Sequence, residues 1–501
     1  MSDPTFGISI TRVDNEPRPA IVSDMSVVGL VGTAPSANAQ TFPLNTPVAI
    51  YSDDAAALTA LGEDGSLPDA IAGINDQLGE FQVAARVVVV RIEPGDDTDA
   101  AIANAVGSQA AKTGIWALAS SGPLLGVIPR LIAVPGLTSQ QDKGLATLTL
   151  GTQGSDMTEA PTVGFTGGGT DPDKELPTAE AVMGTGDDAD KVVGLTILTA
   201  GKNLTDTLVV TFSGGGDDEN KVLPTATAVV ETLANPVCAA LPAVLNKLLA
   251  VAVVDGPATT QQDYTDWRET IQSERLIPVE TAVKVGVDAT VKPASPRVIG
   301  IAVRRDHQFG GRPFHSWANQ PVQGIVGPSR PIDFSLTDGA TEGQALIAQN
   351  AGIIVRGEMG VETAIASGGF VYIGTDTCAE DTLWQFYHVV RGRDFIHLMF
   401  LRTLRGFLGT RNIDYGTVQD ILDTMRFALR DIKADGDILD YKVGFTRDQN
   451  SPEQLRLGKF VVDFAAEEPP VLRYLGIRSS RYRAALDILL DDLLAQIDVA
   501  A

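Results

Sequence analysis

The four histidines are the side chains of this 501-residue chain best suited to metal binding or acid-base catalysis. His307 and His315 flank the loop Gln-Phe-Gly-Gly-Arg-Pro-Phe, and a zinc site built on them would need a third ligand that no nearby motif supplies. His388 and His397 lie nine residues apart in sequence rich in Phe, Tyr and Leu, which favours hydrogen-bonded, partly buried imidazoles. We therefore interpret all four as structural residues and predict no metal site.

Nucleophilic and phosphate-binding motifs are also absent from the sequence. Cys238 and Cys378 lie outside any C-x-x-C pattern, which supports neither a disulfide framework nor a thiolate zinc site and suits folding in a reducing cytoplasm. No G-x-S-x-G and no G-x-x-x-x-G-K-[ST] occurs, and the triple glycines at 167–169 and 214–216 do not open helices, which favours turns. We expect no catalytic residue and no cofactor.

Three acidic clusters could offer oxygen ligands to calcium, but none has the spacing of a twelve-residue calcium loop. They are Asp171/Asp173/Glu175, Asp187/Asp188/Asp190 and Asp217/Asp218/Glu219. We interpret them as solvated turns. The formal net charge of −25 opposes phosphate binding by counterion release, so nucleic acid is not an expected partner.

The composition is that of a folded multidomain protein, with 44% hydrophobic and 20% charged residues. No apolar run reaches the length needed to cross a bilayer, so no membrane partner is expected. The first twenty residues carry Asp3, Arg12, Asp14 and Glu16 where a secretory signal would need an apolar core.

The first residues predict an extended N-terminal arm over 1–25. Phe6, Ile8 and Ile10 alternate with Gly7, Ser9 and Thr11, which is the period of a strand with one apolar face. A strand without a partner in its own chain is a template for joining a neighbour's sheet.

An α/β domain follows, divided between residues 26–138 and 235–290. Buried strands are predicted at 84–92, 130–136 and 250–257, and helices at 55–61, 67–78 and 237–249. The helix expected after the strand at 130–136 comes a hundred residues late, which indicates an insertion.

The insertion, residues 139–234, contains an internal repeat. Residues 165–182 align without gaps with 212–229 at an offset of 47, and twelve of the eighteen positions are identical. Thr- and Val-rich runs between Gly and Asp clusters predict two copies of a small β unit. With 15 acids against 5 lysines, the insertion is expected to face solvent.

The last third is predicted to be an α/β domain over 291–480 with an amphipathic helix over 481–501. Strands are expected at 298–303, 459–464 and 471–475, and helices at 395–407 and 417–433. The closing helix places one apolar stripe along its length: Leu486, Leu489, Leu490, Leu493, Leu494 and Ile497. Five arginines are compatible with either a cationic partner-binding face or ordinary surface ion pairs: Arg391, Arg393, Arg402, Arg405 and Arg411.

Two segments resemble the tail sheath proteins of contractile bacteriophages. One is Phe6-Gly7-Ile8, then Arg18-Pro19 and residues 27–35; the other is residues 317–327 continuing into Ser329-Arg330-Pro331-Ile332. The resemblance covers roughly residues 5–135 and 235–480. Residues 139–234 fall outside it.

The resemblance implies a structural subunit, not an enzyme, that polymerises as stacked hexameric rings around an inner tail tube and contracts to drive the tube into the host envelope. Its partners would be neighbouring sheath subunits, the tube protein, and baseplate and tail terminator proteins. It would reside in the virion tail after assembly in the host bacterial cytoplasm, and serve host cell penetration and genome ejection.

The resemblance also assigns residues to these contacts. Phe6, Ile8 and Ile10 would be the strand donated to a neighbour, and the final domain would face the tube through Arg393, Arg402 and Arg405. The receiving sheet would contain Phe460, Val462, Phe464, Leu472 and Tyr474.

Two alternatives remain open from the sequence. The chain could be a virion decoration or adhesin protein whose β repeats bind a ligand, or an intracellular α/β enzyme with a β-repeat insert. The closing helix stands where the family has an extended arm, so whether it links subunits or packs on its own subunit is open.

Overall fold

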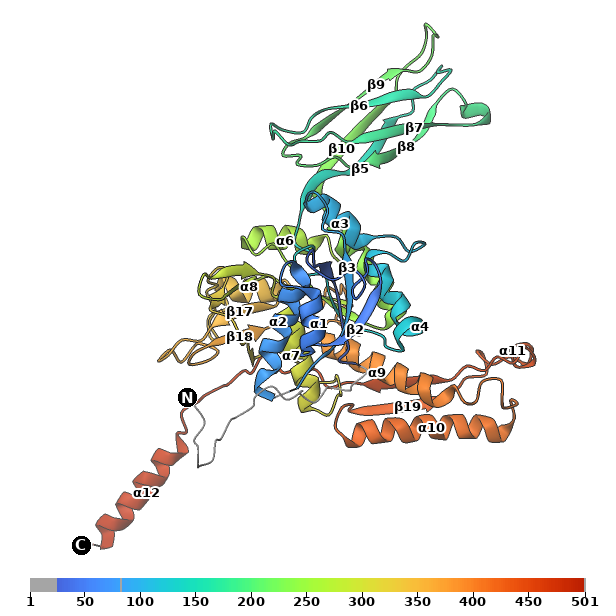
Figure 1. Ribbon diagram of the computed structural model, residues 1–501. Coiled ribbons are helices and arrows are strands. Elements are labelled where there is room, and N and C mark those ends of the chain that lie inside the picture. Colours follow the sequence, from blue (N-terminus) through green and yellow to red (C-terminus); the bar gives the residue numbers. More distant parts are fainter. Residues whose placement is uncertain (1–24, 82, 500–501) are drawn as a thin grey trace, which may run out of the picture. The chain divides into compact units, whose positions relative to one another are not determined.

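The computed structural model describes residues 25–81 and 83–499 of the chain (Figure 1). The chain divides into two compact units, Met1–Pro469 and Pro470–Ala501. The predicted donor residues Phe6, Ile8 and Ile10 lie outside the described residues.

A six-stranded sheet organises the first unit, with the strand order β12-β11-β4-β1-β3-β2. Its strands are β1 (Val28–Thr33), β2 (Pro47–Tyr51), β3 (Arg86–Ile92), β4 (Leu131–Ala133), β11 (Val251–Asp255) and β12 (Leu276–Val279). All neighbours pair in parallel except β2, which is antiparallel to β3. The strands predicted at 84–92, 130–136 and 250–257 are confirmed, and so is the α/β class.

Helices cover both faces of this sheet. In β3, Val87 and Val89 point into one apolar layer and Val88 and Val90 into the other, as alternation along a strand requires. The first layer is covered by α1 (Ala55–Leu61), α2 (Ser66–Leu78) and α7 (Ser295–Gln308), and the second by η2 (Gly114–Ser120), α3 (Thr98–Val106), α5 (Pro236–Leu248) and α6 (Gln261–Glu269). The predicted helices at 55–61, 67–78 and 237–249 are confirmed.

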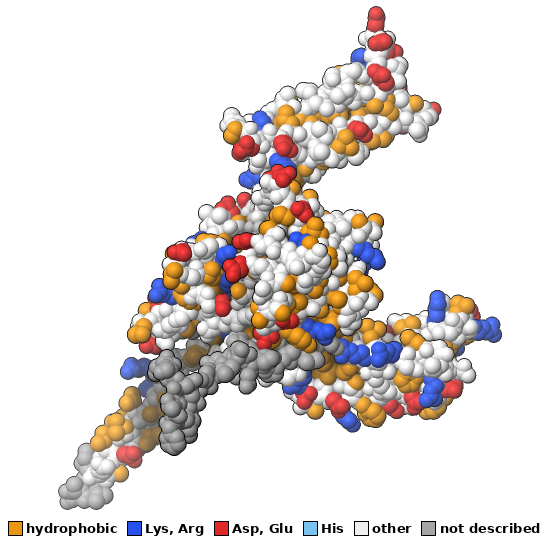
Figure 2. All heavy atoms as spheres, in the orientation of Figure 1, with side chains coloured by type: hydrophobic (Ala, Val, Ile, Leu, Met, Phe, Trp, Pro, Cys, Tyr) orange, Lys and Arg blue, Asp and Glu red, His pale blue; other side chains and the backbone are white. Residues whose placement is uncertain are grey.

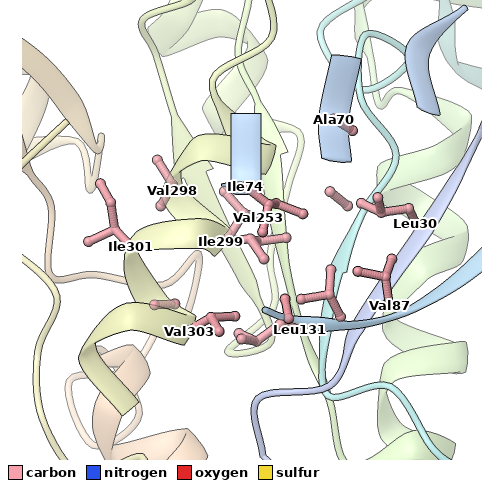
Figure 3. Packing of buried hydrophobic residues seen from close by; sticks show 14 of the residues in the cluster. Leu30, Ala70, Ile74, Val87, Leu131, Val253, Val298, Ile299, Ile301 and Val303 are labelled. Atoms are coloured by element: carbon pink, nitrogen blue, oxygen red, sulfur yellow. The ribbon is translucent and has the colours of Figure 1, made fainter. Parts of the chain in front are cut away.

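Residues 298–303 form part of α7, so the strand predicted there is wrong. The amide and hydroxyl of Ser295 donate to the buried carboxylate of Asp255 at 2.8 and 2.6 Å, and Pro296 occupies the first turn. A carboxylate and a proline both favour a helix N-terminus. A continuous apolar run as short as residues 298–303 shows no hydrophobic periodicity, so the sequence alone cannot distinguish a buried helix from a buried strand there. Figure 3 shows Val298, Ile299, Ile301 and Val303 packed with Leu131 and Val253.

Shorter elements complete the α/β part of this unit. They are η1 (Gly79–Phe81), α4 (Ser121–Leu125), β13 (Val283–Val285), β14 (Thr290–Lys292), β15 (Gln320–Pro321), β16 (Gly327–Pro328), α8 (Glu342–Ala348), β17 (Ile353–Arg356) and β18 (Phe370–Ile373). β14, β13 and β16 form one small sheet, and β15, β18 and β17 form another.

The segment between β4 and α5 is a β module of six strands. They are β5 (Asp142–Thr152), β6 (Pro161–Gly167), β7 (Thr178–Met183), β8 (Val192–Thr199), β9 (Leu208–Gly214) and β10 (Thr225–Leu233), with the short η3 (Gly186–Asp188) between β7 and β8. β9 lies 47 residues after β6 at both ends, which is the offset of the sequence repeat. The main pairings join the two copies: β5 with β10, β6 with β9, and β7 with β8. The two repeats therefore exchange strands.

The triple glycines begin with the last residues of β6 and β9 and continue into the connections that follow, so they open no helix, as predicted, and all six have positive φ. In the first turn the Lys174 ammonium donates to the carbonyls of Gly167 and Gly169 at 2.9 and 2.6 Å. Lys221, its counterpart in the second repeat, donates to Gly216.

The last part of the first unit combines two helices with a two-stranded sheet. The elements are α9 (Tyr387–Leu404), α10 (Tyr415–Ala434), β19 (Asp440–Gly444), α11 (Pro452–Arg456) and β20 (Asp463–Glu467). The helices predicted at 395–407 and 417–433 are confirmed, and α9 begins earlier than predicted.

The second unit contains the predicted closing helix, α12 (Ala484–Val499). Its leucines from Leu486 to Leu494 are 45–61% exposed, and Figure 2 shows hydrophobic side chains along its surface. No helix within residues 25–81 and 83–499 combines the length and hydropathy that a membrane span requires.

Candidate inter-subunit interface

Helices α9 and α10 support the two-stranded antiparallel sheet of β19 and β20. The register places Tyr441 opposite Ala466 and Val443 opposite Phe464, and these four side chains pack against the helices. The side chains between them are mostly exposed, so the other face of the sheet meets solvent. Each strand has one partner in the described part of the chain, and the outer edges of such a sheet carry main-chain groups without a ladder partner.

Three predicted receiving residues lie at or just before β20. Phe464 is in the strand, with its ring centroid 5.0 Å from that of Phe400 on α9. Phe460 and Val462 precede the strand, so β20 begins later than the predicted 459–464. The Asn450 side chain accounts for the shift: it accepts from the amide of Val461 at 2.8 Å and donates to its carbonyl at 2.9 Å, in place of a neighbouring strand.

The other two predicted receiving residues lie in the second unit. Leu472 and Tyr474 are 77% and 85% exposed, and residues 468–482 have no regular secondary structure, so the strand predicted at 471–475 is wrong for the isolated chain. A strand needs a neighbouring strand to complete its ladder, and no strand of the described residues pairs with residues 471–475. Its apolar side chains are left uncovered.

Arg393, predicted to face the tube, makes contacts within its own chain. Its guanidinium donates to both carboxylate oxygens of Glu468 at 2.9 and 2.8 Å, and to the carbonyl of Ala466 at 2.6 Å. These bonds tie the end of β20 to α9. Bidentate arginine–carboxylate pairs are among the stronger hydrogen-bonded contacts in proteins.

Arg402 and Arg405, the other residues predicted to face the tube, are exposed at the end of α9. Arg411, which follows the helix, is exposed as well. A cationic surface at this end of α9 therefore remains compatible with the structure.

The beginning of the described chain is held by a buried ion pair. Arg391 on α9 and Asp306 on α7 form two hydrogen bonds of 3.0 and 2.6 Å, and their side chains are 1% and 2% exposed. Arg391 also donates to the carbonyl of Met25 at 2.9 Å, and the Ser26 hydroxyl donates to Asp306 at 2.8 Å. The point where the predicted arm joins the fold is thus fixed by charged side chains from two helices.

His315 and His388 occupy packing positions, whereas His307 is exposed in the last turn of α7. His315 stacks on Phe309 with ring centroids 3.5 Å apart, and burial, aided by the nearby Arg305 and Arg312, lowers its pKa to about 4. A ring nitrogen of His388 lies 3.0 Å from the Pro469 carbonyl, and burial lowers the His388 pKa. No group of three metal-ligating side chains is placed to hold an ion within the part of the chain that the structure describes.

Both cysteines are buried free thiols. Burial raises the pKa of Cys378 to about 11 and also raises that of Cys238, so neither is an activated nucleophile. Two acidic clusters form turns, in which Asp171 accepts from the amide of Asp173 at 2.9 Å and Asp218 from that of Asn220 at 2.8 Å, whereas Asp187 and Asp188 of the third lie in η3.

The sequence interpretation missed the burial of Arg391. It grouped this residue with the exposed arginines, although Arg391 follows Tyr387 by four positions and precedes Asp394 by three. Tyr387 and Asp394 are both buried, so helical spacing along α9 places Arg391 on the inward face. That spacing was the available signal.

Comparison with known proteins finds similarity to tail sheath proteins. Residues 26–92, which span β1 to β3, match the family model described as tail sheath protein Gp18 domain III N-terminal region. A prophage major tail sheath protein of Pseudomonas aeruginosa (strain UCBPP-PA14) is 30% identical over 227 residues, which cover 44% of this chain and 55% of that relative. The chain thus spans about half the length of this relative.

Two further similarities extend along nearly the whole chain. The tail sheath protein of Escherichia phage P2 is 21% identical over 495 residues, covering 95% of this chain and 96% of that protein. The contracted helical sheath of the anti-feeding prophage has a TM-score of 0.52 at 13% identity, covering 96% of this chain and all of the other. At that identity the structural likeness shows a shared fold.

Proposed function

Because the chain belongs to the contractile phage tail sheath family, we propose that it polymerises as stacked hexameric rings around an inner tail tube and contracts to drive the tube into the host envelope. Its role is that of a structural subunit. The work is mechanical and involves no catalytic step and no cofactor.

The observation that carries this proposal is the open β19–β20 sheet on α9 and α10. A two-stranded sheet is marginal by itself, and an added strand supplies main-chain hydrogen bonds together with register. Phe6, Ile8 and Ile10 form the donated strand, and Phe460, Val462 and Phe464 belong to the receiving side. In the assembly, the segment with Leu472 and Tyr474 pairs with a strand of a neighbouring subunit, since no strand of the described residues pairs with it.

The exposed apolar residues of the second unit support assembly. Leu475, Ile477 and Tyr482 are 70–83% exposed, which adds to the uncovered surface at 472 and 474. Several large apolar side chains exposed along one short segment favour an interaction site. In the proposed sheath this surface is buried between subunits.

The remaining contacts follow the same division. The domain over 291–480 faces the tube, with Arg402 and Arg405 on the tube side, and the ends of the sheath meet baseplate and terminator proteins. The β module over 139–234 faces outward as a surface domain. Assembly takes place in the host cytoplasm before incorporation into the virion tail, in keeping with two free buried thiols.

Electron microscopy of the purified full-length protein tests the proposal. We expect hollow, striated cylinders whose striations repeat at a constant spacing. A uniform monomer over a wide range of protein concentration and ionic strength would contradict it. Co-expression with the tube protein should yield cylinders with a filled lumen.

A further inference from the structure

We propose that helix α9 transmits mechanical load between the strand that a subunit receives and the arm that it donates. This inference rests on the proposed function, since it concerns the strand links of an assembled sheath. Load enters and leaves the helix at two side chains, Arg391 and Arg393.

Arg391 holds the arm root, which is the start of the described chain at Met25 and Ser26. Arg391 binds the Met25 carbonyl directly, and through Asp306 it also holds the Ser26 hydroxyl. Its guanidinium lies 5.1 Å from the centre of the Trp317 ring, which in turn stacks on Tyr387 of α9. Tension on the residues before Met25 therefore reaches α9 and α7 before it reaches β1.

Arg393 holds the end of the receiving strand, β20. Arg393 binds Glu468, directly after β20, and the carbonyl of Ala466 within it. The Glu468 side chain is 2% exposed, so water competes little for this pair. Tension on a strand added to this sheet reaches α9 through the pair and through the packing of Phe464.

The positions of the two arginines on the helix fit this role. Residues two apart on an α-helix are about 200° apart around the axis, with a rise of about 3 Å between them. Arg391 and Arg393 thus extend from nearly opposite sides of one rigid element, toward Asp306 and Glu468 respectively. The path between the two links is one short stretch of helix.

Two further contacts fix the helix in place. Asp394 pairs with Arg275, which also donates to the Ala250 carbonyl just before β11. A Cβ added at Gly392 would lie 2.5 Å from the Phe314 ring, so the helix and that ring touch without spare room. The helix is therefore held against the sheet domain while load passes along it.

Arg391→Lys and Arg393→Lys test the proposal, because lysine keeps the charge but cannot make the bidentate contact. Arg297→Lys is the matched control. Arg297 is 2% exposed and pairs with Asp69 at 3.3 Å, but it contacts neither the arm root nor β20. Cylinders of each variant are sheared under one fixed condition, and their lengths are measured by electron microscopy.

We expect the mean length after shear to fall about twofold or more for Arg391→Lys and Arg393→Lys, and to stay at the wild-type value for Arg297→Lys. The Arg391 and Arg393 contacts carry the same load one after the other, so the cylinder breaks at whichever contact is weaker. The double variant should therefore give cylinders as long as those of the weaker single variant.

Cylinders of equal mean length after shear for all variants would overturn the proposal. Shorter cylinders from Arg297→Lys would overturn it as well. The same holds if the double variant gives cylinders much shorter than those of either single variant. If a variant does not polymerise, hydrogen exchange of the full-length monomer decides. The proposal then requires faster exchange near Met25–Val28 in Arg391→Lys and at Asp463–Glu467 in Arg393→Lys, with the six-stranded sheet unchanged; any other pattern would overturn it. Failure of the wild-type chain to polymerise would instead count against the proposed function.

Discussion

Gly164 and Thr211 face each other across β6 and β9, and because they stand 47 residues apart each is the counterpart of the other in the sequence repeat. A two-fold axis relating the two repeats therefore passes through this pair. Side-chain contacts obey it: the hydroxyls of Thr152 and Thr225 lie 2.9 Å apart, and those of Thr178 and Thr199 lie 2.8 Å apart. The β module has the symmetry of a dimer contained in one chain.

Removing one repeat should convert this internal symmetry into dimerisation. Deletion of residues 142–188 places β8 where β5 begins and leaves β8, β9 and β10 without their partners from the first repeat. In a chain that also lacks residues 1–12, we expect dimers by light scattering after gel filtration, because a second copy restores all the pairings. A chain lacking residues 1–12 and 139–234 is the control and should be monomeric. A monomeric single-repeat chain would show that strand exchange is not required.

Removing residues 1–12 alone should leave a folded subunit that cannot form cylinders. The donated strand is lost, whereas the contacts of Met25 and Ser26 with Arg391 and Asp306 are kept. Circular dichroism and thermal melting should match the full-length monomer, and electron microscopy should find no cylinders. The control that lacks residues 139–234 instead should still assemble. Normal cylinders from the first variant would remove the arm from the mechanism.

Charges at positions 472 and 474 should block assembly without affecting the fold. We expect Leu472→Asp and Tyr474→Asp to change the free energy of unfolding of the monomer by no more than about 0.5 kcal/mol, because both side chains are exposed. Cylinder formation, followed by light scattering, should be lost, since a charge would be buried in the interface. Met359→Asp, at a side chain that is 89% exposed, is the matched control and should assemble. Equal assembly by all three variants would contradict the prediction.

Glu280 should make the folded subunit more stable at mildly acidic pH than at pH 8. Burial raises the pKa of its carboxyl to about 7, despite the hydrogen bonds from Arg330 at 3.1 Å and the amide of Ala258 at 3.2 Å. The pKa in the folded chain lies above the unfolded value of 4.5, so the stabilisation is complete below pH 4.5 and is lost as pH rises through 7. The loss amounts to about 3 kcal/mol.

Glu280→Gln cannot ionise and should remove this dependence. Denaturant unfolding at several pH values should show the free-energy difference between variant and wild type rising in favour of the variant from pH 5 to pH 8. Glu342→Gln, at the other carboxylate that Arg330 contacts, keeps Glu280 and should keep most of the wild-type slope, because the Glu342 charge is the smallest of the causes that act on the Glu280 pKa. Parallel curves for Glu280→Gln and wild type would contradict the assignment.

Local patterns were enough to predict much of the α/β fold. The helix at 55–61 was predicted from Asp53-Asp54 followed by an apolar run, and Asp54 indeed accepts from the amides of Ala56 and Ala57. The continuous apolar run of β3, which is buried on both faces, and the helical spacing in α10 are equally local signals. The offset of 47 was read directly from identical residues.

The failures share a physical origin in contacts between distant parts of the chain. The start of α7 depends on Asp255, forty residues before Ser295, and Arg391 is buried because Asp306 lies opposite it. Strand exchange between the repeats leaves no local trace, since pairing within a copy and between copies uses the same alternation. The segment around Leu472 has the pattern of a strand, but no strand of the described residues pairs with it.

The pairing of β5 with β10 brings the first and last strands of the β module together, with Asp142 opposite Leu233. These two adjacent strand ends form a suitable site for inserting a foreign domain. Insertions are tolerated best when the two termini of the inserted domain lie close together, as these strand ends do. An enzyme or a peptide epitope with neighbouring termini could be grafted between these positions and displayed once per subunit. A polymer of such chains would present the guest as a periodic array along its length.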